Sequence, residues 1–294
     1  MIYFLEVLLN GAVVGSLYAL IALAFVVVYK ATRIINFALG EFVMFASSIV
    51  AVGLHVLGFG LLLSLGFGVI GMAAFAMVFN HLVMRHLLGH RLISLIMVTI
   101  GLGAFMRGLA VFLFIGVPKS IELPFSADAW DVGGMLISPH ELSSAATAAL
   151  CIAMVGWFFL KSRTGIALRS ISDDQQAAMA MGINVPWHFA MTWALAGAIA
   201  VAGGALWTYV TGGGFSMVLV GLKVFPIVII GGLDSIPGVI VGAMLIGILE
   251  AVAAAFLDPI VGGGMSSVTA YVVLIVALMV RPYGLFGRVD VERV

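Results

Sequence analysis

The sequence predicts an all-α integral membrane protein with about eight or nine transmembrane helices, on three observations. The 294-residue chain is 64% hydrophobic and only 9% charged, whereas soluble domains are usually about 25% charged. Long apolar runs recur along the chain and are separated by short polar gaps. The 36 glycines suit membrane helices, because small residues let two helices approach closely. A chain with so little polar surface cannot coat a soluble globule.

The predicted spans are the apolar segments that approach the roughly 20 residues needed to cross a bilayer. The second and the seventh predicted spans, 39–57 and 219–233, are short or interrupted. The N-terminus lacks a basic region and a cleavage pattern, so we expect a retained first span rather than a signal peptide. Residues 1–294 are therefore interpreted as a single transmembrane domain, with predicted spans at 5–29, 39–57, 61–80, 93–117, 141–160, 188–211, 219–233, 237–257 and 266–280.

The distribution of Lys and Arg predicts the orientation, because cytoplasmic loops are enriched in these residues. One side carries ten of them, and the other side carries Lys119 alone. This bias places the N-terminus outside, the C-terminus inside, an external loop at 118–140 with Glu122, Asp128 and Asp131, and a cytoplasmic loop at 161–187. The ten are Lys30, Arg33, Arg85, Arg91, Lys161, Arg163, Arg169, Arg281, Arg288 and Arg293.

Several function classes leave no trace in the sequence. There is no G-x-x-x-x-G-K-[ST] nucleotide loop, no H-E-x-x-H zinc motif and no evident Ser-His-Asp arrangement. The lone cysteine, Cys151, excludes an intrachain disulfide and a cysteine-rich metal site. We therefore expect a pore or permease body with no catalytic residues and no metal; an intramembrane enzyme is the weakest alternative.

The cytoplasmic loop contains a predicted short helix at about 173–181. Ser172 can cap it, with Asp173 and Asp174 in the first turn and Gln175 at the capping-box position. Gly182 can end it in a left-handed conformation. Small and methionine side chains on such a helix suit docking into a groove of another protein, whereas a helix resting on lipid usually needs a basic face. The side chains predicted to be exposed are Ala177, Ala178, Met179 and Met181.

The run DDQQAAMAMGI, at residues 173–183, resembles the coupling motif of ABC importer permeases. More narrowly, the chain resembles the LivH-type permeases of branched-chain amino acid importers over nearly its whole length. It departs from that pattern at Leu39, where the family often has His, and at Asp234, where it has Gly. The motifs that carry the resemblance are GSLYALIAL (15–23), INFALGEF (35–42), LISLIMVTIGLGAFMRG (92–108), GLKVFPIVIIGGLDSIPG (221–238), GILEAV (247–252) and RPYGLFG (281–287).

The resemblance implies a division of labour between subunits. This chain would form half of the pore in the inner membrane, beside a second, LivM-like permease. Two cytoplasmic ATPases would use the ATP, and a periplasmic binding protein would deliver the amino acid; this chain would bind no cofactor and no nucleic acid. The resemblance assigns contact with an ATPase to the coupling helix and its residues Asp173, Asp174, Gln175, Ala177, Ala178 and Gly182.

The two weak spans are the predicted lining of the translocation path, because transport sites favour short or broken helices. The first offers Asn36, Gly40 and Glu41, and the second offers Lys223 and Phe225. Glu250, the carboxylate placed deepest in an apolar run, is the remaining candidate, since ionisable groups inside a bilayer usually face protein or water.

Each candidate also has a structural interpretation. Lys223 could reach the external headgroups, Arg107 could do the same or pair with Glu250, and Glu41 could sit near water in the second turn of a helix capped by Asn36. The pairs Gly11/Gly15 and Gly238/Gly242 are better explained by helix packing. Alternatives for the whole protein are a permease for urea, amides or another small polar solute, or a self-contained secondary transporter or channel.

Overall fold

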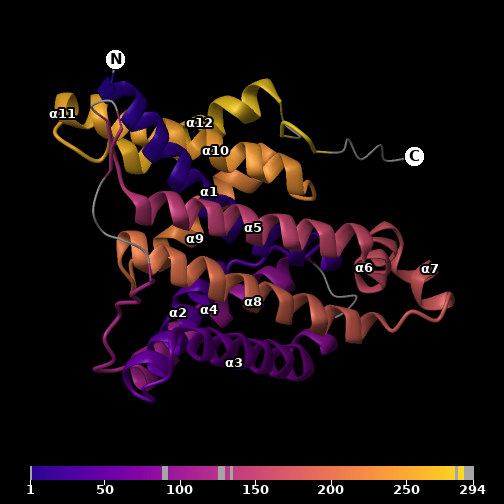
Figure 1. Ribbon diagram of the computed structural model, residues 1–294. Coiled ribbons are helices and arrows are strands. Elements are labelled where there is room, and N and C mark those ends of the chain that lie inside the picture. The colour runs from indigo at the N-terminus through magenta and orange to yellow at the C-terminus, as the bar shows by residue number, and fades with distance from the viewer. Residues whose placement is uncertain (1, 88–91, 125–129, 133–134, 282–283, 288–294) are drawn as a thin grey trace. The chain divides into compact units, whose positions relative to one another are not determined.

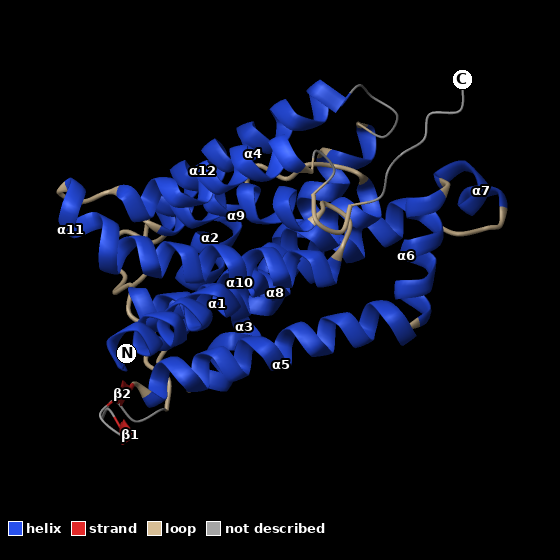
Figure 2. Cartoon of the chain, turned by 90° about the horizontal axis from the view of Figure 1, so that it is seen from above, coloured by secondary structure: helices blue, strands red, loops and turns tan. Residues whose placement is uncertain are grey.

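The computed structural model describes all residues except 1, 88–91, 125–129, 133–134, 282–283 and 288–294 (Figure 1). Arg91, Asp128, Arg288 and Arg293, which entered the predictions above, lie outside the described residues. Almost every described element is a helix, which confirms the predicted all-α membrane class (Figure 2). The elements are α1 (Ile2–Thr32), α2 (Leu39–His55), α3 (Leu61–Leu82), η1 (Met84–His86), α4 (Leu92–Leu113), β1 (Trp130–Val132), β2 (Met135–Ile137), α5 (Pro139–Lys161), α6 (Arg163–Asp173), α7 (Gln175–Ala180), α8 (Val185–Thr211), α9 (Met217–Gly231), α10 (Ile236–Val252), η2 (Ala253–Leu257), α11 (Asp258–Val261) and α12 (Met265–Val280).

Each predicted span falls on a helix. Among the described residues, six apolar helical segments are long enough to cross a membrane, and α2, α9 and α12 are shorter apolar helices. The prediction that the second and seventh spans are short is confirmed, since α2 has 17 residues and α9 has 15. α12 is about as short, with 16 residues, although its predicted span at 266–280 was not singled out. The orientation derived from Lys and Arg stays a prediction.

Two details escaped the sequence. The loop predicted to be external contains two short antiparallel strands, in which Trp130 pairs with Ile137 and Val132 with Met135 (Figure 2). Strands of three residues are too short to show an alternating pattern. In addition, η2 is a π-helical turn that follows α10 directly. Such wide turns often occur at functional sites.

The chain divides into two compact units, which are described separately. Unit 1 comprises Met1–Ala22, Pro124–Ala149 and Lys223–Val294, and unit 2 comprises Leu23–Leu123 and Leu150–Leu222. Three of the four boundaries fall inside α1, α5 and α9, and the fourth lies between Leu123 and Pro124, so each unit is assembled from segments far apart in the sequence.

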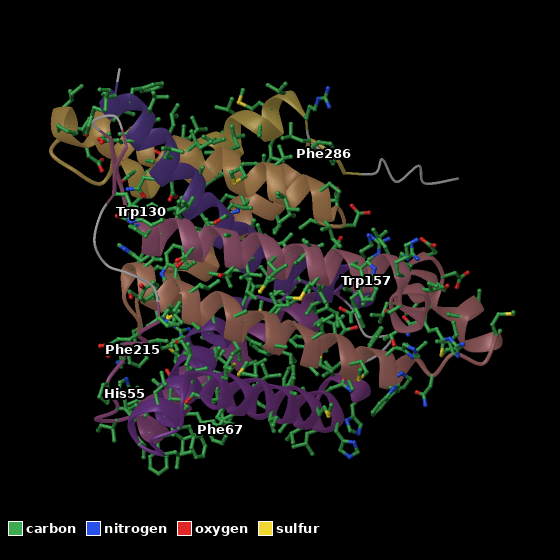
Figure 3. The ribbon with its side chains drawn as sticks, viewed as in Figure 1. His55, Phe67, Trp130, Trp157, Phe215 and Phe286 are labelled. Carbon is green, nitrogen blue, oxygen red and sulfur yellow. The ribbon has the colours of Figure 1, made fainter. Side chains whose placement is uncertain are left out.

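Unit 2 is built around α2, α3 and α8, which pack on one another (Figure 1). Trp193 of α8 is fully buried between Phe42 of α2 and Phe79 of α3, with ring centroids 5.8 and 5.3 Å away. Aromatic contacts of this kind stabilise a core beyond the area they bury. At the outer surface of the same unit, Phe67 and Trp157 are exposed (Figure 3), as expected of side chains that face lipid.

Unit 1 is organised by α10, which packs on α12, with η2 and α11 beside them. The C-terminal segment folds back on the end of α9, where Leu285 donates its N–H to the Ile230 carbonyl at 2.7 Å. Gly232 and Gly284 have φ of 105° and 76°, a region that disfavours other residues. Leu285 and Phe286 of the motif RPYGLFG thus make backbone contacts with α9.

Candidate functional site

Unit 1 buries a cluster of three polar side chains from α1, α9 and α10. Lys223 Nζ lies 3.1 Å from both carboxylate oxygens of Glu250. The Tyr18 hydroxyl donates a hydrogen bond of 2.8 Å to Glu250 Oε2, and Lys223 Nζ lies 3.4 Å from the Tyr18 oxygen. Glu250 is only 7% exposed. The positive partner and the hydroxyl donor both stabilise this buried carboxylate, in which Oε2 accepts the hydrogen bonds and Oε1 makes only the ion-pair contact with Lys223 among the described residues.

Glycines bring α1 and α10 close enough to form this cluster. A Cβ built on Gly247 would lie 2.5 Å from the Gly15 backbone, and one on Gly11 would lie 2.7 Å from the Ile248 backbone. Because only glycine permits this approach, Tyr18 and Glu250, each three residues beyond a crossing glycine, meet across it. Gly238 and Gly242 make comparable contacts with α9. Both glycine pairs therefore serve packing, as predicted.

A cavity of about 710 Å³ lies beside the cluster, entirely within unit 1. Lys223 and Glu250 line it together with polar side chains from the first turns of α1 and α5. Its polar lining is completed by Glu6, Asn10, Ser138, Glu141 and Ser266.

Unit 2 contains a second buried carboxylate, Glu41 of α2, which is 5% exposed. Its Oε1 lies 3.1 Å from Arg107 Nε on α4. Gly103, one turn before Arg107, makes room for it, since a Cβ there would lie 3.1 Å from the carboxylate. Glu41 thus does not face water beside a helix end, and Arg107 pairs with Glu41 rather than with Glu250 as one alternative held.

Gly40 fixes a close crossing in unit 2. A Cβ on Gly40 would lie 2.6 Å from the Val218 carbonyl, and one on Gly221 would overlap the Gly40 backbone. The two spans singled out as short, α2 and α9, therefore cross at these glycines. Asn36 is fully buried and its Oδ1 accepts the Ala38 N–H at 3.0 Å. It closes a turn before α2 and does not cap the helix, whose first flanking residue is Ala38.

The structure thus sorts the predicted path residues into two groups. Lys223 and Glu250 come together at the cavity of unit 1, whereas Asn36, Gly40 and Glu41 lie in unit 2. Phe225 is partly buried on α9 and is not among the described residues that line the cavity. Whether any of them contacts cargo stays a prediction.

Sequence reasoning gave no role to Glu6, Asn10 and Tyr18. A signal was present, because Glu6, Asn10 and Tyr18 are separated by four and eight residues in a mostly apolar helix. Polar residues on successive turns of one side of a membrane helix indicate a face turned toward protein or a cavity.

The loop at 161–187 differs from its prediction in its helix boundaries and in its cap. It forms two helices, since Ser172 and Asp173 belong to α6. The cap of α7 is Asp174, whose Oδ1 accepts N–H groups of Gln176 and Ala177 at 2.8 and 2.9 Å, so neither the Ser172 cap nor the capping box of Gln175 forms. The left-handed Gly182, with φ of 85°, is confirmed.

Ala178 was predicted to be exposed and is buried. It packs with Ile171 of α6 and with Val185 and Phe189 of α8. A helix as short as α7 needs such an anchor, because six residues do not form a stable isolated helix. The exposed residues of the loop include the polar Gln176 as well as Ala177, Met179, Ala180 and Met181.

Comparisons with known proteins decide the family. The model of the family described as the permease component of branched-chain amino acid transport systems matches residues 7–280. The chain belongs to this family. It is 32% identical to the high-affinity branched-chain amino acid transport system permease protein BraD of Pseudomonas aeruginosa, over 99% of this chain and 98% of that protein. It is 29% identical to LivH of Escherichia coli K12, over 100% of this chain and 98% of LivH.

A solved structure supports the fold of this family member. PsaBC from Streptococcus pneumoniae, in complex with Fab, matches with a TM-score of 0.52 over 94% of this chain and 92% of that chain, at 16% identity. The predicted resemblance to LivH-type permeases is confirmed. Together with the membrane-length helices, it makes the chain a multi-pass permease protein of the inner membrane.

Proposed function

We propose that this chain is the permease subunit of an ATP-driven importer for branched-chain or related amino acids and supplies half of the translocation pore. Its relatives along the full length are named as permeases of branched-chain amino acid transport systems. The observation that carries the coupling to ATP is α7, a capped helix with an exposed face, held between α6 and α8. In this proposal the chain hydrolyses no ATP and binds no cofactor.

The proposed partners are a second, LivM-like permease, two cytoplasmic ATPases that use ATP, and an external binding protein that delivers cargo. The excess of Lys and Arg places α6 and α7 on the cytoplasmic side. The exposed Ala177, Met179 and Met181 suit insertion into a groove of an ATPase, because small and methionine side chains adapt to a partner surface.

The buried side of the loop suits transmission of force. Ile171, Ala178 and Phe189 belong to three different helices and form one cluster. Because packed side chains resist deformation, a displacement of α7 by an ATPase moves α8 with it. Asp174, Gln175 and Gly182 then set the shape of the docking segment, and Asp173 ends the helix that supports it.

The decisive experiment is expression of this chain with its genomic neighbours. We expect co-purification with a second permease and two ATPases, and ATP-dependent uptake of labelled leucine, isoleucine or valine. Uptake of urea or amides in place of amino acids would overturn the proposed cargo. A chain that purifies alone and transports without ATP would overturn the importer.

Ala177→Glu tests the docking face. The residue is exposed, so the chain should fold, but a charged side chain in an apolar groove should release the ATPases and lower uptake by at least about tenfold. Ala177→Ser is the matched control and should retain both. Normal assembly and uptake in Ala177→Glu would remove α7 from the interface.

A further inference from the structure

The cavity of unit 1 combines charge with an apolar wall. Glu6, Asn10 and Glu141 line it on the first turns of α1 and α5, where they are partly or fully exposed. Lys223 and the buried Glu250 line it deeper, on α9 and α10. Its volume of about 710 Å³ is ample for a small organic solute and its water.

The Lys223–Glu250 pair offers two opposite charges side by side at the cavity wall. An α-amino acid carries an ammonium and a carboxylate on the same carbon. Each of these charges can therefore face the opposite charge of the Lys223–Glu250 pair. Its ammonium would bind Glu250 and its carboxylate Lys223. The Tyr18 hydroxyl holds Glu250 at 2.8 Å, so the carboxylate is oriented before cargo arrives.

The rest of the wall suits an aliphatic side chain. It is formed by small and branched residues on α1, α5, α10 and the π turn η2, and the wide turn places Ala254 and Ala255 in the lining. Burying a leucine or valine side chain there stabilises the bound state by removing apolar surface from water. The aliphatic lining includes Val7, Val13, Val14, Leu142, Ala251 and Ala254.

The lining carries an excess of acid. Among the described residues that line the cavity, the deeper Lys223 and Glu250 cancel in formal charge, and Glu6 and Glu141 nearer the mouth leave a formal net charge of −2. A cleft lined by one sign of charge concentrates ions of the other sign and repels its own. An anionic solute is therefore disfavoured before it reaches the pair.

We propose that the cavity lined by Glu6, Glu141, Lys223 and Glu250 binds zwitterionic aliphatic amino acids at the Lys223–Glu250 pair and excludes anionic solutes at its mouth. This inference rests on the proposed function, because it assigns the cargo of the importer to a place in the chain.

The single native cysteine makes a direct test possible. In a Cys151→Ala background, Val14→Cys puts a thiol on the cavity wall, and Val56→Cys, exposed at the end of α2, puts one outside the residues that line it. The intact complex in right-side-out vesicles is treated with cationic or anionic methanethiosulfonates of similar size. The rate of modification is measured with and without leucine.

We expect leucine to slow modification of Val14→Cys and not of Val56→Cys. Isocaproate, which lacks the ammonium, and isoamylamine, which lacks the carboxylate, should need at least about tenfold higher concentration for the same protection. The ratio of cationic to anionic reagent rates at Val14→Cys should fall by about tenfold in Glu6→Gln/Glu141→Gln. It should be unchanged in Glu122→Gln, an external carboxylate outside the lining.

Failure of this inference is distinguishable from failure of the proposed function. If the complex takes up leucine with ATP but leucine does not protect Val14→Cys, or isocaproate protects equally well, the cavity is not the amino acid site. An unchanged reagent ratio in the double variant overturns the acidic filter. If the assembled complex takes up no branched-chain amino acid, the proposed function fails whatever the labelling shows.

Discussion

Each unit buries a carboxylate beside a point where glycines let two helices cross closely. The two carboxylates differ in their partners and in the exposure of those partners. In unit 1, Glu250 follows the crossing of α1 and α10 and pairs with Lys223, whose side chain is 23% exposed. In unit 2, Glu41 follows the crossing of α2 and α9 and pairs with Arg107, whose side chain is 50% exposed. Tyr18 adds a hydroxyl to the first pair. The first pair lines the cavity of unit 1, and Glu41 and Arg107 do not line it.

This difference separates two uses of charge in an apolar chain. A half-exposed guanidinium keeps access to water or headgroups, so the Glu41–Arg107 pair can join α2 to α4 at modest cost. The Lys223–Glu250 pair is more buried, and desolvation of both ions is expensive. A costly pair that also lines a cavity is better explained by transport than by stability.

The largest expected effect comes from filling the crossings. Gly221→Val and Gly247→Val each place a side chain on a neighbouring backbone, so we expect a cost of about 3 kcal/mol or more and loss of folded protein. Yield of monodisperse protein in detergent and its thermal midpoint measure this. Gly66→Val, on α3 with no atom within 4 Å of its Cβ, is the control and should fold normally.

The two crossings are expected to be equally intolerant, because both bring backbone against backbone. If Gly247→Val folds while Gly221→Val does not, the α1–α10 contact of unit 1 is looser than the structure has it, and the Tyr18–Glu250 bond that depends on it loses its support.

Neutralising each carboxylate should affect stability and uptake differently in the two units. Glu250→Gln leaves Lys223 without its carboxylate in a mostly buried place, at a cost of about 3 kcal/mol, and should abolish uptake. Glu41→Gln leaves Arg107 half exposed, costs about 1 kcal/mol or less, and should keep uptake within about threefold. Thermal midpoints and leucine uptake of the assembled complex are the measurements. Lost uptake in an assembled Glu41→Gln complex would instead place Glu41 in the path.

The sequence predicted where the helices lie better than it predicted which side chains contact one another. Apolar runs and glycines were enough to locate every span, because membrane helices satisfy their own backbone. The partners of Glu41 and Glu250 depend on how helices rotate against one another, and they lie far away in the sequence. Arg107 is 66 residues from Glu41, and Glu250 is 27 residues from Lys223 and 232 from Tyr18. The Ala178 error has the same origin: a local pattern places a residue on a helix, but only tertiary packing decides which side of α7 is buried.

Removing both charges of unit 1 tests whether the pair is kept for stability. Lys223→Met/Glu250→Leu replaces the ions by apolar side chains, and such replacements are often neutral or stabilising. We expect the free energy of unfolding, followed by the thermal midpoint, to recover to within about 1 kcal/mol of the parent while uptake stays lost. Recovery of uptake together with stability would show that the pair serves folding alone and would remove the contrast with Glu41–Arg107.

Tyr18→Phe is the smallest change that still distinguishes the two units. It removes the hydroxyl that donates to Glu250 and leaves the Lys223–Glu250 pair intact, so the stability cost should be about 1 kcal/mol. Because Glu250 then loses its fixed orientation toward the cavity, we expect weaker apparent affinity for leucine, by about tenfold or less, with the maximal uptake rate little changed. Tyr29→Phe, which removes a phenol hydroxyl elsewhere on the same helix, is the control. Equal uptake kinetics in both variants would show that Tyr18 only packs against α10, and the third group of the unit 1 cluster would then have no part in binding.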